Sequence, residues 1–198
     1  MKAETLQVPD ASLYYEVRGS GPVLLMIPGG PMDADGFKEI AHEPPVSELL
    51  PDAARYHALN EQVGVTYRSD GTFAALQMFT KGVGFGNDGP PPPAEQTPEA
   101  AAAGARMGAN LELFAGRLIP IIGNYEPDLA ALQHSSTRIV VGVGDESTPE
   151  QMVYQTAHAL AERLGSQPAQ FPGGHGGFGS HPDGFAARLR EVLAAAEG

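Results

Sequence analysis

The residues Val23-Leu24-Leu25-Met26-Ile27-Pro28-Gly29-Gly30-Pro31 guide the interpretation of the whole chain. A short apolar run bounded by Gly and Pro is typical of a buried strand that ends in a tight turn. The glycines allow backbone N–H groups to approach a ligand closely, because glycine has no Cβ. The stretch therefore predicts a central strand with an exposed loop, and we expect the functional site beside that loop.

The composition sets limits on the class of protein. The chain has 198 residues, of which 42% are hydrophobic and 18% charged, and this predicts one core and one domain. The net charge of -12 disfavours nucleic acid and anionic membranes, since both attract clustered Lys and Arg. The absence of cysteine excludes disulfides, thiolate metal sites and a cysteine nucleophile. No apolar run approaches the roughly 18 residues that span a bilayer, and the first residues lack a signal-peptide pattern, so we expect a cytoplasmic protein.

Strand patterns precede the central strand and helical patterns follow it. Residues 6–8 and 13–17 alternate well enough to predict a hairpin. After the central strand, Asp33 can cap a short helix through about Ala41. From residue 46 to about 118 apolar side chains recur every three or four positions, which predicts helices. The members of these stripes are Tyr56, Leu59, Val63 and Tyr67, then Met107, Leu111, Phe114 and Leu118 in a helix that starts at Thr97-Pro98. The proline-rich residues 86–93 between them predict a solvated connector, with a lid hinge as the alternative.

The C-terminal part alternates strands with helices. Residues 138–143 predict a strand that ends in the polar loop Gly144-Asp145-Glu146-Ser147, and residues 149–164 predict the helix that follows. A short strand at 169–171 leads into Gly173-Gly174-His175-Gly176-Gly177. Pro182 then opens a last helix, whose expected inward side chains are Phe185, Leu189, Val192 and Ala196. Such alternation implies a mixed or parallel sheet, and these sheets place their chemistry at the C-terminal ends of strands.

In the order of these features the chain resembles the α/β-hydrolase-fold family over nearly its whole length. The resemblance implies that the loop after the central strand forms an oxyanion hole, with backbone N–H groups from Gly29, Gly30 and Met32. It implies that His175 is the catalytic histidine and that Asp145 or Glu146 is the acid that orients it, although Ser147 stands where the family's acid most often lies. We expect no cofactor and, from the spacing of the histidines, no metal.

The chain departs from that family at the nucleophile. A serine hydrolase of this kind carries its nucleophile in a G-x-S-x-G elbow, and none of the serines in this chain has that frame. Ser20, between Gly19 and Gly21, comes nearest to that frame, but it lies in a turn before a strand rather than between a strand and a helix. Between Ile27 and His42-Glu43-Pro44-Pro45, a segment that resembles the lead into the family's cap, there is room for about one helix. The family places two or more strand–helix units there, each of roughly 30 residues. We therefore expect an internally shortened chain whose nucleophile is unknown.

The expected fold is α/β: a reduced α/β-hydrolase-like mixed sheet of about five strands with flanking helices and a helical cap insertion. Residues 1–45 would form the N-terminal strands and the oxyanion-type loop, residues 46–134 the cap, and residues 135–198 the C-terminal βαβα part of the same core. We expect the sheet order 1-2-3-4-5, with the Leu24 strand beside the Ile139 strand. The competing expectation is a chain that forms homodimers or aggregates through exposed strand edges.

Two classes of function follow from these residues, both with a small-molecule partner. The first is a hydrolase that acts on a small ester or amide beneath the cap, with His175 as base and either a substitute nucleophile or directly activated water. The second is a non-catalytic relative that binds an apolar ligand, or an inactive truncated copy. Residue chemistry alone favours a functional and a purely structural role about equally for His175, Asp145 and Glu146. The other histidines show no helical metal-pair spacing and are predicted to be surface or packing residues; they are His42, His57, His134, His158 and His181.

Overall fold

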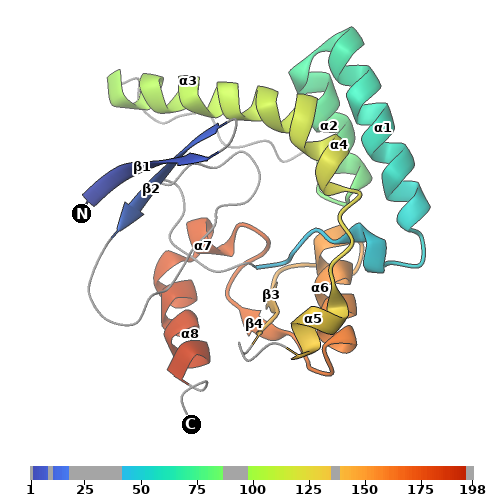
Figure 1. The fold of residues 1–198 in the computed structure, drawn as a ribbon, viewed down its shortest axis with the longest axis vertical. Helices are drawn as coiled ribbons and strands as arrows, with labels where there is room; N and C mark the ends of the chain where they lie inside the picture. Colours follow the sequence, from blue (N-terminus) through green and yellow to red (C-terminus); the bar gives the residue numbers. More distant parts are fainter. Residues whose placement is uncertain (1, 9–10, 18–41, 87–97, 135–138, 195–198) are drawn as a thin grey trace.

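The computed structural model describes residues 2–8, 11–17, 42–86, 98–134 and 139–194 (Figure 1). These segments are mostly helical, and their strands form two separate two-stranded sheets. In Figure 1 the helices α1 to α4 gather in one half of the molecule, and the β3–β4 sheet lies in the other half with α5 to α8.

Several predictions lie outside the described residues. They include the strand and loop at 23–31, the proposed oxyanion donors Gly29, Gly30 and Met32, the short helix after Asp33, and most of the proline-rich loop. The expected pairing of the Leu24 strand with the Ile139 strand lies there too. These features, the five-stranded sheet, the homodimer and the cytoplasmic location stay predictions.

The N-terminal hairpin is confirmed. Strands β1 (Lys2–Val8) and β2 (Ala11–Val17) pair antiparallel, with Leu6 opposite Leu13. Both strands are longer than the apolar alternation predicted, because the pairing extends through the polar residues on either side of it.

The middle of the chain is helical, as predicted. After a short 3-10 helix (Ser47–Leu49) come α1 (Ala53–Asp70), α2 (Thr72–Gly82), α3 (Pro98–Leu113), a π-helical turn η2 (Phe114–Leu118), α4 (Ile119–Ile122) and α5 (Leu129–His134). The first predicted stripe is confirmed, since Tyr56 and Val63 are buried. The second stripe is only partly covered: Met107 is 41% exposed. The reason is that the packing on α1 and α2 lies mainly in η2, the C-terminal continuation of α3, and Met107 lies before that contact.

The second sheet is short and parallel. Strand β3 (Gly142–Gly144) pairs with β4 (Ala169–Phe171), and His42 forms a parallel bridge with Gly142 on the opposite side of β3. The strand predicted at 169–171 is confirmed. Of the strand predicted at 138–143, residues 142–143 are confirmed, residues 139–141 are not in a strand because β4 offers only three residues to pair with, and residue 138 lies outside the described residues. The Ala169 N–H donates to Val141 O at 2.8 Å, at the start of the ladder.

Helices pack on both faces of this sheet. On one face Val141 and Val143 contact α6 (Met152–Arg163), and on the other Phe171 contacts α8 (Pro182–Ala194). The predicted helices at about 149–164 and from Pro182 are confirmed. Three of the expected inward residues of the last helix are buried, namely Phe185, Leu189 and Val192, and the fourth, Ala196, lies outside the described residues. Before α6 the Thr148 N–H donates to the Gln151 side chain at 3.0 Å, but the cap predicted at Thr148 is wrong, because α6 begins at Met152 with Gln151 as its N-cap. The short helix α7 (Gly177–Ser180) connects β4 to α8. The result is a helix–sheet–helix core that leaves the strand ends open.

Candidate functional site

The candidate site lies where β3 and β4 end and where the His42-Glu43 segment joins β3 from the side. The loops after the two strands are tied together, since the Asp145 N–H donates to Phe171 O at 2.9 Å and the Glu146 N–H to Gly173 O at 3.1 Å. The parallel bridge brings Glu43 to the same edge, where its N–H donates to Gly142 O at 3.2 Å. Three segments far apart in sequence therefore converge on one sheet edge.

His175 is held by a buried carboxylate. Its Nδ1 lies 3.1 Å from Glu43 Oε2, and the other oxygen of Glu43 accepts the Gly144 N–H at 2.9 Å. The Glu43 side chain is 0% exposed, whereas that of His175 is 43% exposed. Within the described residues, Nε2 of His175 has no hydrogen-bond partner. A histidine fixed through Nδ1 and open at Nε2 has the arrangement of a general base.

The Glu43 carboxylate is ionised at neutral pH. Burial opposes its ionisation, but the polar contacts from His175, Ser147 and the Gly144 N–H together outweigh burial and hold the pKa of Glu43 below its usual 4.5. The contact from Ser147 is the weaker kind, because its buried Oγ makes no hydrogen bond of normal geometry within the described residues. Because an ionised carboxylate only accepts hydrogen bonds, Nδ1 of His175 carries the proton.

The structure places the two predicted acids beside the histidine loop and brings neither to the imidazole. Asp145 Oδ1 accepts the Gly173 N–H at 2.8 Å, which fixes the start of that loop. Glu146 Oε1 lies 3.8 Å from His181 Nε2. Among the described residues, the carboxylate in contact with His175 is that of Glu43, which the sequence analysis assigned only to the lead into the cap. The bridge of His42 to Gly142 creates this contact, and a tertiary pairing leaves no local signal in the sequence.

His42 packs against the same sheet edge, which confirms the prediction that it is a surface or packing residue. Its ring lies edge-on to Phe171 at 5.5 Å and to Phe185 at 5.2 Å, and its Nε2 lies 3.4 Å from Gly174 O. Burial lowers the pKa of His42 below 6.5, although the Glu43 charge and the Gly174 carbonyl raise it and His175 lowers it further. His42 therefore stays neutral and anchors the loop that carries His175.

The remaining histidines are also surface or packing residues. His57 contacts Glu48, His181 contacts Ser180, and His134 and His158 each lie within hydrogen-bond distance of a carbonyl in their own helix. In the part of the chain that the structure describes, no three His, Asp or Glu side chains are grouped to hold a metal ion. None of the described helices is both long and apolar enough to cross a membrane.

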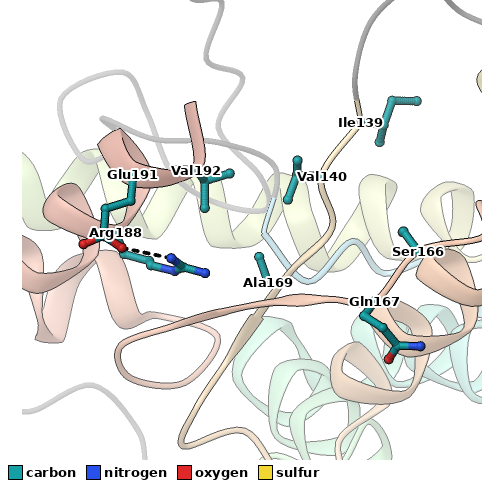
Figure 2. A pocket seen from close by; sticks show the side chains of 8 residues that line it. All are labelled: Ile139, Val140, Ser166, Gln167, Ala169, Arg188, Glu191 and Val192. Carbon is teal, nitrogen blue, oxygen red and sulfur yellow. Dashed lines mark hydrogen bonds and ion pairs between the residues drawn. The ribbon is translucent and has the colours of Figure 1, made fainter. Parts of the chain in front are cut away.

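A separate cavity of about 270 Å³ lies at the opposite ends of the strands (Figure 2). Arg188 on its wall pairs with Glu191 at 2.9 Å and donates to Gln170 O at 3.0 Å. Its lining residues precede β3 and β4, begin β4 or belong to α8: Ile139, Val140, Ser166, Gln167, Ala169, Arg188, Glu191 and Val192. The cavity is therefore distinct from the edge that carries His175.

Acid is expected to destabilise the fold in two stages. Because the pKa of His42 is lowered on folding, its stabilising contribution is complete above about pH 6.5 and is lost as the pH falls toward the folded value. The pKa of Glu43 is also lowered, so its contribution is present above about pH 4.5 and is lost as the pH falls through its folded value. Urea unfolding from about pH 8 to about pH 3 measures both stages of this dependence.

The variant His42→Gln should show a flatter dependence below about pH 6.5, because glutamine does not titrate. His134→Gln, a change at an exposed histidine, should retain the wild-type slope. Equal slopes in all three proteins would contradict the assignment to His42.

The site combines an exposed histidine with a buried carboxylate that holds it, an arrangement that suits a hydrolase. The chain is similar to the uncharacterized hydrolase YraK of Bacillus subtilis (strain 168), with 26% identity over 257 aligned positions that cover 96% of this chain and 95% of the relative. The alignment is longer than the 198 residues of this chain, so the relative holds residues that this chain lacks within the matched stretch. No protein-family model and no solved structure matches the chain. The similarity points to a hydrolase family.

Proposed function

We propose that this protein is a hydrolase in which His175, oriented by Glu43, activates water for attack on a small ester or amide. The observation that carries the proposal is the contact between the exposed imidazole and the fully buried, ionised carboxylate. The similarity to a protein named as a hydrolase supports the reaction type.

The proposed reaction assigns each proton. Nε2 of His175 takes a proton from water while the water oxygen forms a bond to the substrate carbonyl carbon. The carbonyl electrons move onto oxygen, and the imidazolium is stabilised by Glu43 through Nδ1–H. When the tetrahedral intermediate collapses, the same proton passes to the leaving oxygen or nitrogen. The backbone N–H groups of Gly29, Gly30 and Met32 are our proposed donors to the oxyanion, on the strength of the family resemblance.

We further propose that the fold is a reduced α/β-hydrolase core with residues 46–134 as its cap. Three observations support this assignment: the parallel pairing of β3 with β4, the helices on both faces of that sheet, and the histidine at the strand ends. In open parallel sheets the carboxyl ends of the strands are the usual place for a site.

The second candidate is a non-catalytic relative that keeps the site as a binding pocket, or an inactive shortened copy. The observation that favours it is that none of the serines stands in a G-x-S-x-G frame. Without that nucleophile, a serine-type acyl-enzyme cannot form at the usual position.

Turnover of p-nitrophenyl acetate separates the two candidates. His175→Ala is expected to lower the rate by about 100-fold or more, which is the usual contribution of a general base. His134→Ala is the matched control, since it removes an exposed imidazole on α5 that could hydrolyse the ester without any site. Equal rates in wild type and both variants would rule out catalysis by His175 and favour the second candidate.

A serine-directed fluorophosphonate distinguishes the two possible nucleophiles. The wild-type protein is expected to remain unlabelled, because attack by water uses no serine. Labelling that is lost in His175→Ala would show a serine nucleophile and overturn the water mechanism while keeping the hydrolase.

A further inference from the structure

Phe85 brings the helical region into contact with the proposed base. It follows α2 closely, and its ring centroid lies 5.5 Å from that of His175, with 40° between the ring planes. Both side chains are only partly covered. A ligand that reaches the imidazole therefore also meets the phenyl ring.

The position of Phe85 is fixed by its own chain. The Phe85 N–H donates to Thr80 O at 2.8 Å, and the Met152 N–H at the start of α6 donates to Val83 O at 2.9 Å. Gly84, at φ +87°, fits between them, since a Cβ there would lie 2.2 Å from Glu150 O. Since α6 packs on β3, the attachment of residues 83–84 to the start of α6 fixes the position of the Phe85 ring relative to the sheet edge that carries His175.

The ring is also supported by apolar packing. Phe85 lies against a buried cluster formed by Leu50, Tyr56, Val83, Met152 and Val153. A ring held on one side by a core and in contact with the base on the other is a preformed apolar surface.

The charged side chains at the same sheet edge are mostly negative. Glu43 is ionised and Asp145 and Glu146 are exposed at the strand end. Arg55, which reaches the nearby Gly82 carbonyl at 3.3 Å, is already paired with Asp52 at 3.4 Å. Within a chain of net charge -12, this edge repels anions.

We propose that Phe85 forms the apolar wall of the substrate site beside His175, so that the site selects uncharged esters or amides with an apolar or aromatic group over anionic ones. The choice of substrate rests on the function proposed above, whereas the binding preference itself can be tested without turnover.

The test measures protection of His175 from ethoxycarbonylation by diethyl pyrocarbonate, followed by mass spectrometry. Two amides of the same shape are compared: neutral acetanilide and anionic 4-acetamidobenzoate. In the wild type, acetanilide is expected to protect His175 at a concentration about threefold or more below that needed for the anion. In Phe85→Ala, acetanilide is expected to bind about 3- to 10-fold more weakly, which corresponds to one lost aromatic contact.

Two further variants complete the comparison. Phe73→Ala removes a ring of α2 that is 80% exposed, so its protection should equal that of the wild type. Phe85→Leu keeps the packing against the buried cluster but removes the ring, and it should bind acetanilide more weakly than the wild type. This second variant provides the same test should Phe85→Ala fail to fold, as judged by circular dichroism.

Unchanged protection in both Phe85 variants, equal protection by the two amides, or no protection of the wild type up to the solubility limit of acetanilide would each overturn the proposal. Loss of the proposed hydrolase function alone would appear as unaltered ester turnover in His175→Ala. The two failures are distinguishable, because ethoxycarbonylation needs no turnover.

Discussion

Replacing Glu43 with glutamine is expected to lower ester turnover by about 100-fold or more while leaving the protein folded. The Gly144 N–H is a fixed donor at 2.9 Å from one Glu43 oxygen, so the oxygen of the new side-chain amide must face it. The amide nitrogen then faces Nδ1 of His175 and donates to it. This favours the tautomer with its proton on Nε2, which cannot accept a proton from water. The variant also loses the charge that stabilises the imidazolium.

The measurement is the rate of p-nitrophenyl acetate hydrolysis, with circular dichroism to show that the variant is folded. ¹⁵N chemical shifts of the His175 ring report the tautomer directly. Glu48→Gln is the matched control, because the Glu48 carboxylate contacts His57 outside the site. Undiminished turnover in Glu43→Gln would show that Glu43 does not orient the base.

Truncation of Phe185 to alanine is expected to lower the free energy of unfolding by about 3–5 kcal/mol. The side chain is 0% exposed, and its ring lies 4.7 Å from Phe171, 5.2 Å from His42 and 6.2 Å from Phe178. The change leaves a cavity beneath the strand end and removes an aromatic surface that holds His42. In a domain with about 5–15 kcal/mol of stability, this loss leaves little reserve.

Urea unfolding at neutral pH measures this change. Leu193→Ala is the control, since Leu193 lies on the same helix but is 39% exposed, and it should cost much less. Similar losses in the two variants would contradict the central place of Phe185 in the core.

The local elements were predictable because each leaves a local pattern. The alternation around Leu6 and Leu13 indicated the hairpin, and the apolar stripe from Val153 to Leu164 indicated α6, although the helix begins at Met152 rather than at Pro149. The length of β3 was not predictable, because it depends on how much of β4 is available to pair with. The exposure of Met107 likewise depends on where α3 meets other helices.

Of the two residues that form the candidate site, one could be predicted from the sequence. His175 could be selected because a histidine framed by glycines after a strand is a poor core residue. Its partner could not, because Glu43 lies 132 residues away and the nearer acids Asp145 and Glu146 were the local candidates.

Among the described residues, the amino-acid sequence by itself determined the N-terminal hairpin, the helical middle, the apolar faces of α6 and α8, and a histidine after a strand. Each of these follows from periodicity, capping or glycine content within a few neighbouring residues. Only the tertiary structure decided which carboxylate contacts that histidine and which aromatic ring covers it. The bridge from His42 to Gly142 buries Glu43 against His175, and the contact of Gly84 with Glu150 sets Phe85 beside it. Such pairings depend on packing between distant segments, for which local sequence patterns carry no information.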